Sequence, residues 1–306
     1  MHIDEILDGP EPVFSIEFFP PKTPEKVEEL FETVEALKPL NPDYVSVTYG
    51  AGGATRDGTV EIATRIKQDY GLEAMAHLSC VGETREGLTE ILDRFESAGV
   101  QNVLALRGDP PRGEGAFQAP EGGLSSAAEL AEFISASHDF TLGGACFPEV
   151  HPDAPNPEAD LAYLKTKVAA GASFLITQLF FDNRLYFDFV DAARAAGIDV
   201  PIIPGVIPIA TFGQVARICD LCQASIPPEL ESAMEGLGGD EEAEGLLGVA
   251  YAARQCDELL AGGAPGIHFY ALNRAPGTRA VLSALRASRP WERAAGPPPE
   301  PELAVD

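Results

Sequence analysis

Eight short apolar stretches rich in β-forming residues recur along the chain, and at least five of them end in polar or charged residues. One of them, Asn102 to Leu106, is followed directly by Arg107, Gly108 and Asp109. A buried parallel strand that carries charge at its carboxyl end is typical of a (β/α)8 barrel, whose active site lies at that end. The pattern therefore predicts that functional residues lie at strand ends. The strands are expected at Val13 to Phe18, Tyr44 to Thr48, Glu73 to His77, Asn102 to Leu106, Thr141 to Cys146, Phe174 to Gln178, Val200 to Ile203 and Gly266 to Phe269.

Amphipathic segments separate these stretches, so the order of elements is βα throughout and the sheet should be parallel and closed. Helices are expected at Glu25 to Leu37, Thr84 to Ala98, Pro157 to Ala170 and Asp182 to Ala196. Thr23 and Thr84 precede two of them as candidate N-caps. Glycines before four strands provide the positive φ angle that a helix end requires, at positions 71, 99, 171 and 197.

The fold class predicted is a single TIM-type (β/α)8 barrel over residues 1–292, since 306 residues suffice for one barrel with additions. A helical, acidic insert from Ile226 to Leu260 precedes the last strand and is interrupted by a glycine-rich stretch, Gly236 to Asp240. A long loop, Pro110 to Gly123, follows the fourth strand, where barrels carry functional loops. The acidic, proline-rich tail, residues 293–306, is expected to be disordered.

Acidic residues far outnumber basic ones, with 48 Asp and Glu against 21 Lys and Arg and a net charge of -27. This charge disfavours nucleic acid and anionic membranes as partners. Plentiful Leu, Ile, Val and Phe indicate that the chain folds, so the acidic residues should form the surface of a folded protein. Such a surface is typical of proteins from salt-accumulating cytoplasms, and a basic partner protein is the alternative explanation of the acidity. No apolar run approaches the ~20 residues that span a bilayer, and the acidic first twelve residues do not resemble a leader. We expect a soluble, cytoplasmic protein.

The five cysteines do not have the spacing of a disulfide framework. Cys219 and Cys222 are the one close pair, and they fall in an apolar helical pattern without a second pair or a histidine cluster. Core packing is the favoured interpretation of this pair, with metal binding or redox chemistry as the alternative. We expect no metal.

Glu17 is the best candidate for a catalytic group. Alternation along the first strand directs Phe14, Ile16 and Phe18 to one face and Glu17 to the other, so the carboxyl group should point into the barrel near its mouth. A half-buried carboxyl group there would have a raised pKa and could serve as a general acid. The alternative is a structural glutamate paired with a basic residue across the barrel.

Further polar residues follow the next strands: Thr48 and Tyr49, then His77, Asp109 and His151. The glycines after Tyr49 allow a ligand to approach the backbone, but the chain has no G-x-G-x-x-G fingerprint of a Rossmann domain. The titratable groups at one rim do not have the spacing of a three-ligand metal site. A polar organic ligand is therefore expected.

Seven blocks of sequence, in order over residues 13–290, resemble the FAD-containing 5,10-methylenetetrahydrofolate reductases of bacteria. The blocks are Ser15-Ile16-Glu17-Phe18-Phe19-Pro20-Pro21, Val45 to Gly53, Ala76-His77-Leu78, Leu106-Arg107-Gly108-Asp109, Pro148-Glu149-Val150-His151-Pro152, Thr177 to Asp182, and His268 to Arg274.

The resemblance implies a ping-pong reaction that feeds methionine synthesis. In this family a reduced nicotinamide passes a hydride to the flavin, and the flavin passes it to 5,10-methylenetetrahydrofolate. Glu17 matches the general acid, and Asp109 matches the carboxylate beside flavin and pterin. Gln178, Gln214, Tyr270 and Arg274 match substrate contacts. The FAD positions correspond to Thr48, Tyr49, Ala51, His77, Arg107, Gly108, Asp109, Ala127, Phe147, His151, Ala154, Asp160, Tyr163 and Lys167.

The chain departs from this family in two places. Many members have an aromatic residue where this chain has Ser126, and Ile218 replaces an aromatic residue that stacks on the nicotinamide in some members, although Phe212 is close by in sequence. These differences leave the contacts to the adenosine half of FAD and the choice between NADH, NADPH and a protein donor open. Other possible functions are those of another flavin-dependent barrel, such as a proline dehydrogenase, or of a non-catalytic folate- or flavin-binding barrel. The chain length predicts no regulatory domain and no inhibition by S-adenosylmethionine, and we expect a homo-oligomer.

Overall fold

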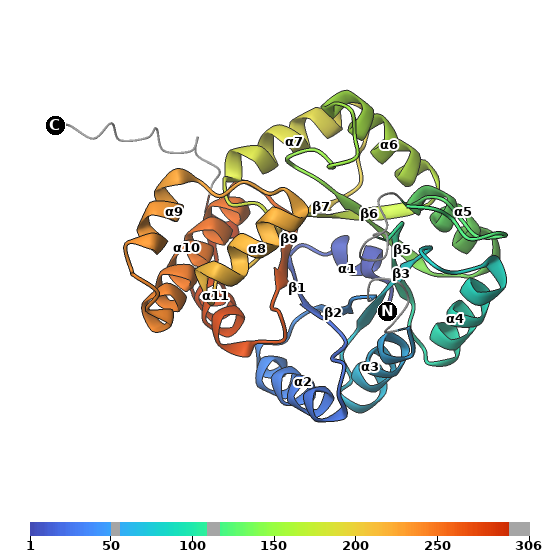
Figure 1. The fold of residues 1–306 in the computed structure, drawn as a ribbon, viewed down its shortest axis with the longest axis horizontal. Helices are drawn as coiled ribbons and strands as arrows, with labels where there is room; N and C mark the ends of the chain where they lie inside the picture. The colour runs from blue at the N-terminus through green and yellow to red at the C-terminus, as the bar shows by residue number, and fades with distance from the viewer. Residues whose placement is uncertain (50–55, 109–116, 294–306) are drawn as a thin grey trace.

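The strands form a parallel barrel in the computed structural model, which describes residues 1–49, 56–108 and 117–293 (Figure 1). The strand order is β7-β6-β5-β4-β3-β2-β1-β9-β8, and each neighbouring pair is parallel. This arrangement confirms the predicted barrel. The strands are β1 Val13–Phe18, β2 Tyr44–Val47, β3 Ala74–Ser79, β4 Asn102–Leu106, β5 Thr141–Cys146, β6 Ala172–Thr177, β7 Ile202–Ile203, β8 Gly205–Val206 and β9 Gly266–Tyr270.

The prediction for the seventh strand, Val200 to Ile203, was wrong in its extent. Two short strands, β7 and β8, flank Pro204 instead. Proline has no N–H group to donate to a strand ladder, and the next N–H, that of Gly205, donates to Oγ1 of Thr177 at 2.9 Å rather than to a backbone carbonyl. β7 pairs with β6 and β8 pairs with β9, so the barrel closes through this interrupted strand.

The helices surround the strands as a ring, with α8, α9 and α10 grouped on one side (Figure 1). The predicted insert is confirmed as α9 and α10, which are separated at the glycine-rich stretch. The four glycines at 71, 99, 171 and 197 have positive φ, as predicted. Of the two candidate N-caps, the Thr84 side chain accepts a hydrogen bond from the N–H of Gly87, whereas the Thr23 side chain makes no capping hydrogen bond. The helices are α1 Ile3–Leu7, α2 Pro24–Leu37, α3 Arg56–Asp69, α4 Arg85–Ser97, α5 Ala127–Ser137, α6 Pro157–Ala169, α7 Asn183–Ala195, α8 Phe212–Cys222, α9 Pro228–Glu235, α10 Glu241–Ala261 and α11 Ala275–Ser288, with 3-10 turns at Lys38–Leu40 and Pro290–Glu292.

Apolar side chains form separate clusters inside and outside the barrel. Phe14, Ile16 and Phe18 pack between the sheet and the helices, as the alternation predicts. Val13, Tyr44, Met75, Leu104, Phe174, Ile176 and Ile203 form the interior cluster together with Ile3 from α1. The sequence did not predict α1. Ile3 is fully buried and its N–H donates to Oδ1 of Asn102 at 2.8 Å, so this helix packs at the amino-terminal end of the barrel and leaves the opposite end for a ligand.

Two further predictions concern the cysteines and the tail. All five cysteines are free thiols, and Cys219 packs in an apolar cluster against which Cys222 also lies, which agrees with the core interpretation. The tail after Arg293 and the first part of the Pro110 to Gly123 loop lie outside the described residues. Among the described helices, none has the length and apolar character needed to cross a membrane.

Candidate active site

A cavity of about 820 Å³ lies at the carboxyl ends of the strands. This volume is within the usual range for organic ligands. Most residues predicted from the sequence as site residues line it together: Glu17, Thr48, Tyr49, His77, Arg107, Gly108, Ala127, Phe147, His151, Ala154, Asp160, Tyr163, Lys167, Gln178 and Tyr270. Glu17 and Tyr270, which are 253 positions apart, both reach the cavity from strands, as the strand-end rule predicts. Ala127, on α5, and Lys167, on α6, were expected only from the resemblance to the reductase family.

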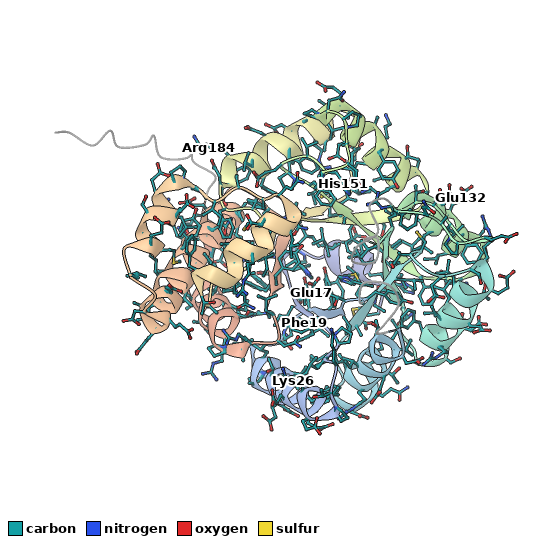
Figure 2. All side chains as sticks on the ribbon, in the orientation of Figure 1. Glu17, Phe19, Lys26, Glu132, His151 and Arg184 are labelled. Atoms are coloured by element: carbon teal, nitrogen blue, oxygen red, sulfur yellow. The ribbon has the colours of Figure 1, made fainter. Side chains whose placement is uncertain are left out.

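Glu17 lies inside the ring of strands (Figure 2), and its side chain retains 18% of its exposure. Its Oε2 accepts a hydrogen bond from Nε2 of His268 at 3.3 Å. Nε2 of His77 lies 3.4 Å from the same oxygen, but it forms no hydrogen bond with any described residue. Among the described residues, no lysine or arginine pairs with Glu17. A purely structural glutamate, paired with a basic residue across the barrel, would have only the imidazoles of His77 and His268 as partners.

Burial lowers the pKa of His77 to about 4, although the nearby Glu17 carboxylate opposes the shift. His77 is therefore a neutral imidazole at neutral pH. Its Nε2 atom is buried, polar and without a hydrogen-bond partner in the described part of the chain, and the side chain lines the cavity. Such an atom is costly to bury unless a ligand or water satisfies it.

The loop from β5 to α6 and one side of α6, as far as Lys167 in its last turn, form one wall of the cavity. The Phe147 and His151 rings meet edge to face at 4.5 Å, and the His151 N–H donates to Oδ2 of Asp160 at 3.0 Å. Nζ of Lys167, almost completely buried, donates to the Ala145 carbonyl oxygen. Burial lowers the pKa of both His151 and Lys167.

Residues at the ends of β2 and β4 continue the lining. The Tyr49 hydroxyl donates to Oε1 of Glu83 at 3.0 Å. Arg107 pairs with Asp153 at 2.8 Å, and its guanidinium lies 5.4 Å from the centre of the Phe117 ring. Two predicted site residues, Ala51 and Asp109, lie outside the described residues.

Gln178 and Tyr270 reach the cavity from the ends of β6 and β9, and the Tyr270 hydroxyl donates to the Thr177 carbonyl oxygen at 2.7 Å. Gln214, in α8, and Arg274, before α11, are not among the lining residues. Ile218 lines the cavity, whereas Phe212 packs with the apolar residues around α8 and α9.

His268 is the residue that the sequence reasoning missed. On β9, Ile267 and Phe269 face outward and His268 and Tyr270 face inward. The alternation that identified Glu17 on β1 would have identified His268 on β9. Ser126, which departs from the family pattern, lines the cavity and caps α5 by accepting a hydrogen bond from the Glu129 N–H at 3.2 Å.

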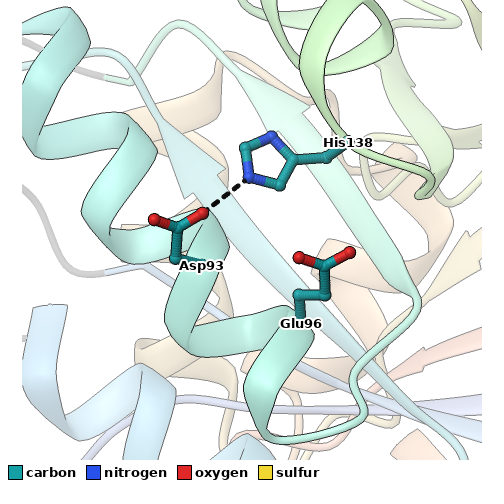
Figure 3. Close-up of side chains that lie close together, drawn as sticks. All are labelled: Asp93, Glu96 and His138. Carbon is teal, nitrogen blue, oxygen red and sulfur yellow. Dashed lines mark hydrogen bonds and ion pairs between the residues drawn. The ribbon is translucent and has the colours of Figure 1, made fainter.

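A cluster of Asp93, Glu96 and His138 places three possible metal-ligand atoms within 4.8 Å of one another on the surface (Figure 3). His138 has partners at both ring nitrogens, Asp93 at 3.0 Å and the Ser137 hydroxyl at 2.9 Å. Both carboxylates are exposed. The cluster is explained by a hydrogen bond between His138 and Asp93 that joins α4 to the end of α5, and among the described residues it gives no separate indication of a metal ion.

Comparison with known proteins identifies the family. The model of the family described as methylenetetrahydrofolate reductase matches residues 2–286. The chain belongs to this family. It is 41% identical to the 5,10-methylenetetrahydrofolate reductase of Salmonella typhimurium and 40% identical to that of Escherichia coli, covering 89% of this chain and 90% of each relative.

Plant members of the methylenetetrahydrofolate reductase family are longer. The chain is 38% identical to methylenetetrahydrofolate reductase (NADH) 1 of Arabidopsis thaliana over 96% of its own length, but it spans about half the length of that relative, 53%. Among solved structures, a protein of Clostridium thermocellum that binds two copies of 5-methyltetrahydrofolate has a TM-score of 0.63. It is 17% identical and covers 94% of this chain and 98% of its own, so it shows the fold alone.

Proposed function

We propose that this chain reduces 5,10-methylenetetrahydrofolate to 5-methyltetrahydrofolate, with electrons from NADH or NADPH that pass through bound FAD. The observation that carries the proposal is the Glu17 carboxyl group, which lines a cavity of about 820 Å³ in a chain of this family. Its position at the carboxyl end of a barrel strand is where such folds carry catalytic groups. The product is suited to methyl transfer in methionine synthesis.

The described residues fit FAD. Lys167 and Arg107 are cations on the cavity walls and suit a diphosphate, while the unpaired Nε2 of His77 suits a polar atom of a flavin ring. Apolar residues such as Ile176 and Leu104 also line the cavity and suit the flat face of an aromatic ring. We assign FAD to the fourteen positions from Thr48 to Lys167 named in the sequence analysis. When bound, the flavin supplies reversible hydride transfer.

Glu17 then acts as the general acid that protonates a folate ring nitrogen, which opens the five-membered ring. The proton moves from a carboxyl oxygen to the nitrogen lone pair, and the carboxylate is left behind. Gln178 and Tyr270 line the same cavity, and we assign them to the pterin. We also assign Asp109 to the flavin and pterin, and Gln214 and Arg274 to substrate contacts farther from the reacting atoms.

The test is anaerobic spectroscopy of the purified protein. A flavin absorbance that NADH or NADPH bleaches, and that 5,10-methylenetetrahydrofolate restores, would support the proposal. Comparing the two nicotinamides identifies the donor. A flavin that is bleached but not restored by the folate would point to another flavin-dependent oxidoreductase, with proline as the alternative reductant to try. A protein that binds folate or flavin without any bleaching would support the non-catalytic alternative.

A further inference from the structure

We propose that His268 is a positioning residue, held in one tautomer by Ser15, that keeps the transferable proton of Glu17 on Oε1. The inference rests on the proposed role of Glu17 as the general acid. It adds an orienting pair: His268 on β9, and Ser15 on β1, the strand that carries Glu17. This pair sets which carboxyl oxygen of Glu17 faces the substrate. Neither residue is among the site residues expected from the sequence.

The geometry is a chain of two hydrogen bonds. The His268 ring lies between Ser15 and Glu17, with Nδ1 2.7 Å from Oγ of Ser15 and Nε2 3.3 Å from Oε2 of Glu17. Ser15 and Glu17 are two positions apart on β1 and point to the same face, and β9 is the neighbouring strand, in register with both. Ser15 and His268 are completely buried, so water does not compete for these bonds.

The partners determine the tautomer. In a neutral imidazole one ring nitrogen donates a hydrogen bond and the other accepts one. A carboxylate can only accept, so Nε2 of His268 carries the hydrogen that faces Oε2 of Glu17. Nδ1 must then accept, and the Ser15 hydroxyl is the donor that it faces. Ser15 thus stabilises the one tautomer that donates to Glu17.

Packing keeps the imidazole in this orientation. The Tyr270 ring meets the His268 ring edge to face at 5.2 Å, and the Tyr270 hydroxyl is tied to the Thr177 carbonyl oxygen. The other titratable groups near the Glu17 carboxyl are His77 on β3 and Tyr44 on β2. Burial lowers the pKa of His77 and raises the pKa of Tyr44, so neither side chain provides a competing charge at neutral pH.

The consequence concerns the direction of proton transfer. Because Oε2 accepts from His268 throughout the cycle, a proton on Glu17 must reside on Oε1, for which the described residues provide no hydrogen-bond partner. The Oε1–H bond breaks as the new N–H bond forms on the folate ring nitrogen. The charge left on the carboxylate is stabilised by the N–H of His268, and solvent can reprotonate the acid through the open cavity after product release.

The first experiment compares two variants in the two half-reactions. In His268→Gln the amide NH₂ can take the place of Nε2–H, whereas in His268→Asn the shorter side chain reaches only the position of Nδ1, so the donor to Glu17 is lost. We expect His268→Asn to slow folate reduction at least ~10-fold, within the ~10²- to 10⁴-fold range of general acid catalysis. Flavin reduction by nicotinamide and the KM for folate should change little, and His268→Gln should recover part of the rate.

A structural role for His268 would produce a different result. Equal losses in both half-reactions, a fall in melting temperature that parallels the loss of rate, or equal rates for the two variants would overturn the inference. Ser15→Ala is the companion variant, since it leaves both imidazole nitrogens and removes only the hydroxyl donor. We expect it to slow the same half-reaction, but less than His268→Asn does.

The second experiment does not depend on catalysis. Long-range ¹H–¹⁵N NMR on protein with ¹⁵N-labelled histidine reports the tautomer of each ring, and the chain has only five histidines. The His268 signal is identified as the one that disappears in His268→Asn. At mildly alkaline pH it should be the signal of a neutral ring with the hydrogen on Nε2. Ser15→Ala should shift the His268 ring toward a mixture of the two tautomers. A Nδ1–H ring, or no response to Ser15→Ala, would overturn the inference even if folate is reduced. If the expected tautomer is observed but the protein does not reduce folate, the proposed function is wrong, while the orienting pair of Ser15 and His268 is established.

Discussion

At the scale of single residues, the cavity brings together groups whose properties are set by burial. Glu17 keeps some exposure to the cavity, whereas His77, beside it, is buried. The partly exposed carboxyl group is therefore accessible from the cavity. The buried imidazole stays neutral and offers a hydrogen-bonding atom instead of a charge.

Replacing Glu17 with Gln should affect only folate reduction, because only that step needs a proton delivered to a ring nitrogen. We expect a loss of ~10²- to 10⁴-fold in the folate half-reaction, with flavin reduction by nicotinamide unchanged. Stopped-flow measurement of the two half-reactions separates these effects. A variant that retained folate reduction within roughly threefold of wild type would show that Glu17 is not the acid.

His77 should make the stability of the fold depend on pH. Its pKa is about 4 in the folded protein against 6.5 in the unfolded chain, so between these values the unfolded chain binds the extra proton. This contribution to the free energy of unfolding is complete above pH 6.5 and is lost as pH falls toward 4, on the order of 3 kcal/mol in total. Urea unfolding of wild type and His77→Gln over this range should show their difference in stability shrinking as pH falls. A difference that is constant with pH would contradict the predicted shift.

At the scale of elements, α10 positions α8 over the cavity. Oε2 of Glu244 in α10 accepts from the Phe212 N–H at the start of α8, at 2.8 Å. Gly248, one turn later, packs against the segment that precedes α8: a Cβ atom there would lie only 2.1 Å from the Ile209 carbonyl oxygen. Since α8 carries Ile218 on the cavity wall, the docking of α10 should influence ligand binding.

Two glycine variants on α10 test this docking. Gly245 is a matched control, because its Cβ would lie an ordinary 3.6 Å from the Ala210 carbonyl oxygen. Both changes to Ala gain about 0.8–1 kcal/mol of helix propensity. We expect Gly245→Ala to be neutral or stabilising, and Gly248→Ala to destabilise the fold by about 1–3 kcal/mol from overpacking and to weaken ligand binding. Denaturant unfolding and the KM values provide the measurement, and equal effects of the two variants would contradict the docking role.

The start of α5 should determine how firmly FAD is held. Ser126 lines the cavity as the N-cap of α5, at a position where the resemblance to the reductase family led us to expect an aromatic residue. A hydroxyl that is already used as a cap offers little surface to a flavin nucleotide. We expect FAD to be partly lost on purification, measured as the flavin-to-protein ratio before and after long dialysis. A protein that stays fully loaded would show that other contacts compensate.

At the scale of the whole molecule, the net charge of -27 should make stability depend on salt. Repulsion among the carboxylates is only partly screened by a Debye length of ~10 Å at 0.1 M salt and is largely removed by ~3 Å at 1 M. We expect the melting temperature and flavin retention to rise together as KCl is increased toward molar concentrations. A flat or falling melting temperature would favour a basic partner protein as the reason for the acidity.

The sequence by itself determined the barrel, the extent of most strands and of helices α2, α4, α6 and α7, and half of the residues that line the cavity. The strands and the first site residues follow from local periodicity: the alternation on β1 places Glu17 inside the barrel, and strand ends share one rim. The lining residues on α5 and α6, such as Ala127 and Lys167, were expected only from the resemblance to the reductase family. The tertiary structure alone decided three things. It broke the seventh strand at Pro204, where a side chain of β6 replaces a ladder bond. It placed α1 at the amino-terminal end of the barrel, through a contact between residues 3 and 102. It also joined Ser15, Glu17 and His268, because the hydrogen-bond partners of a buried polar group are set by strand register and not by neighbours in sequence.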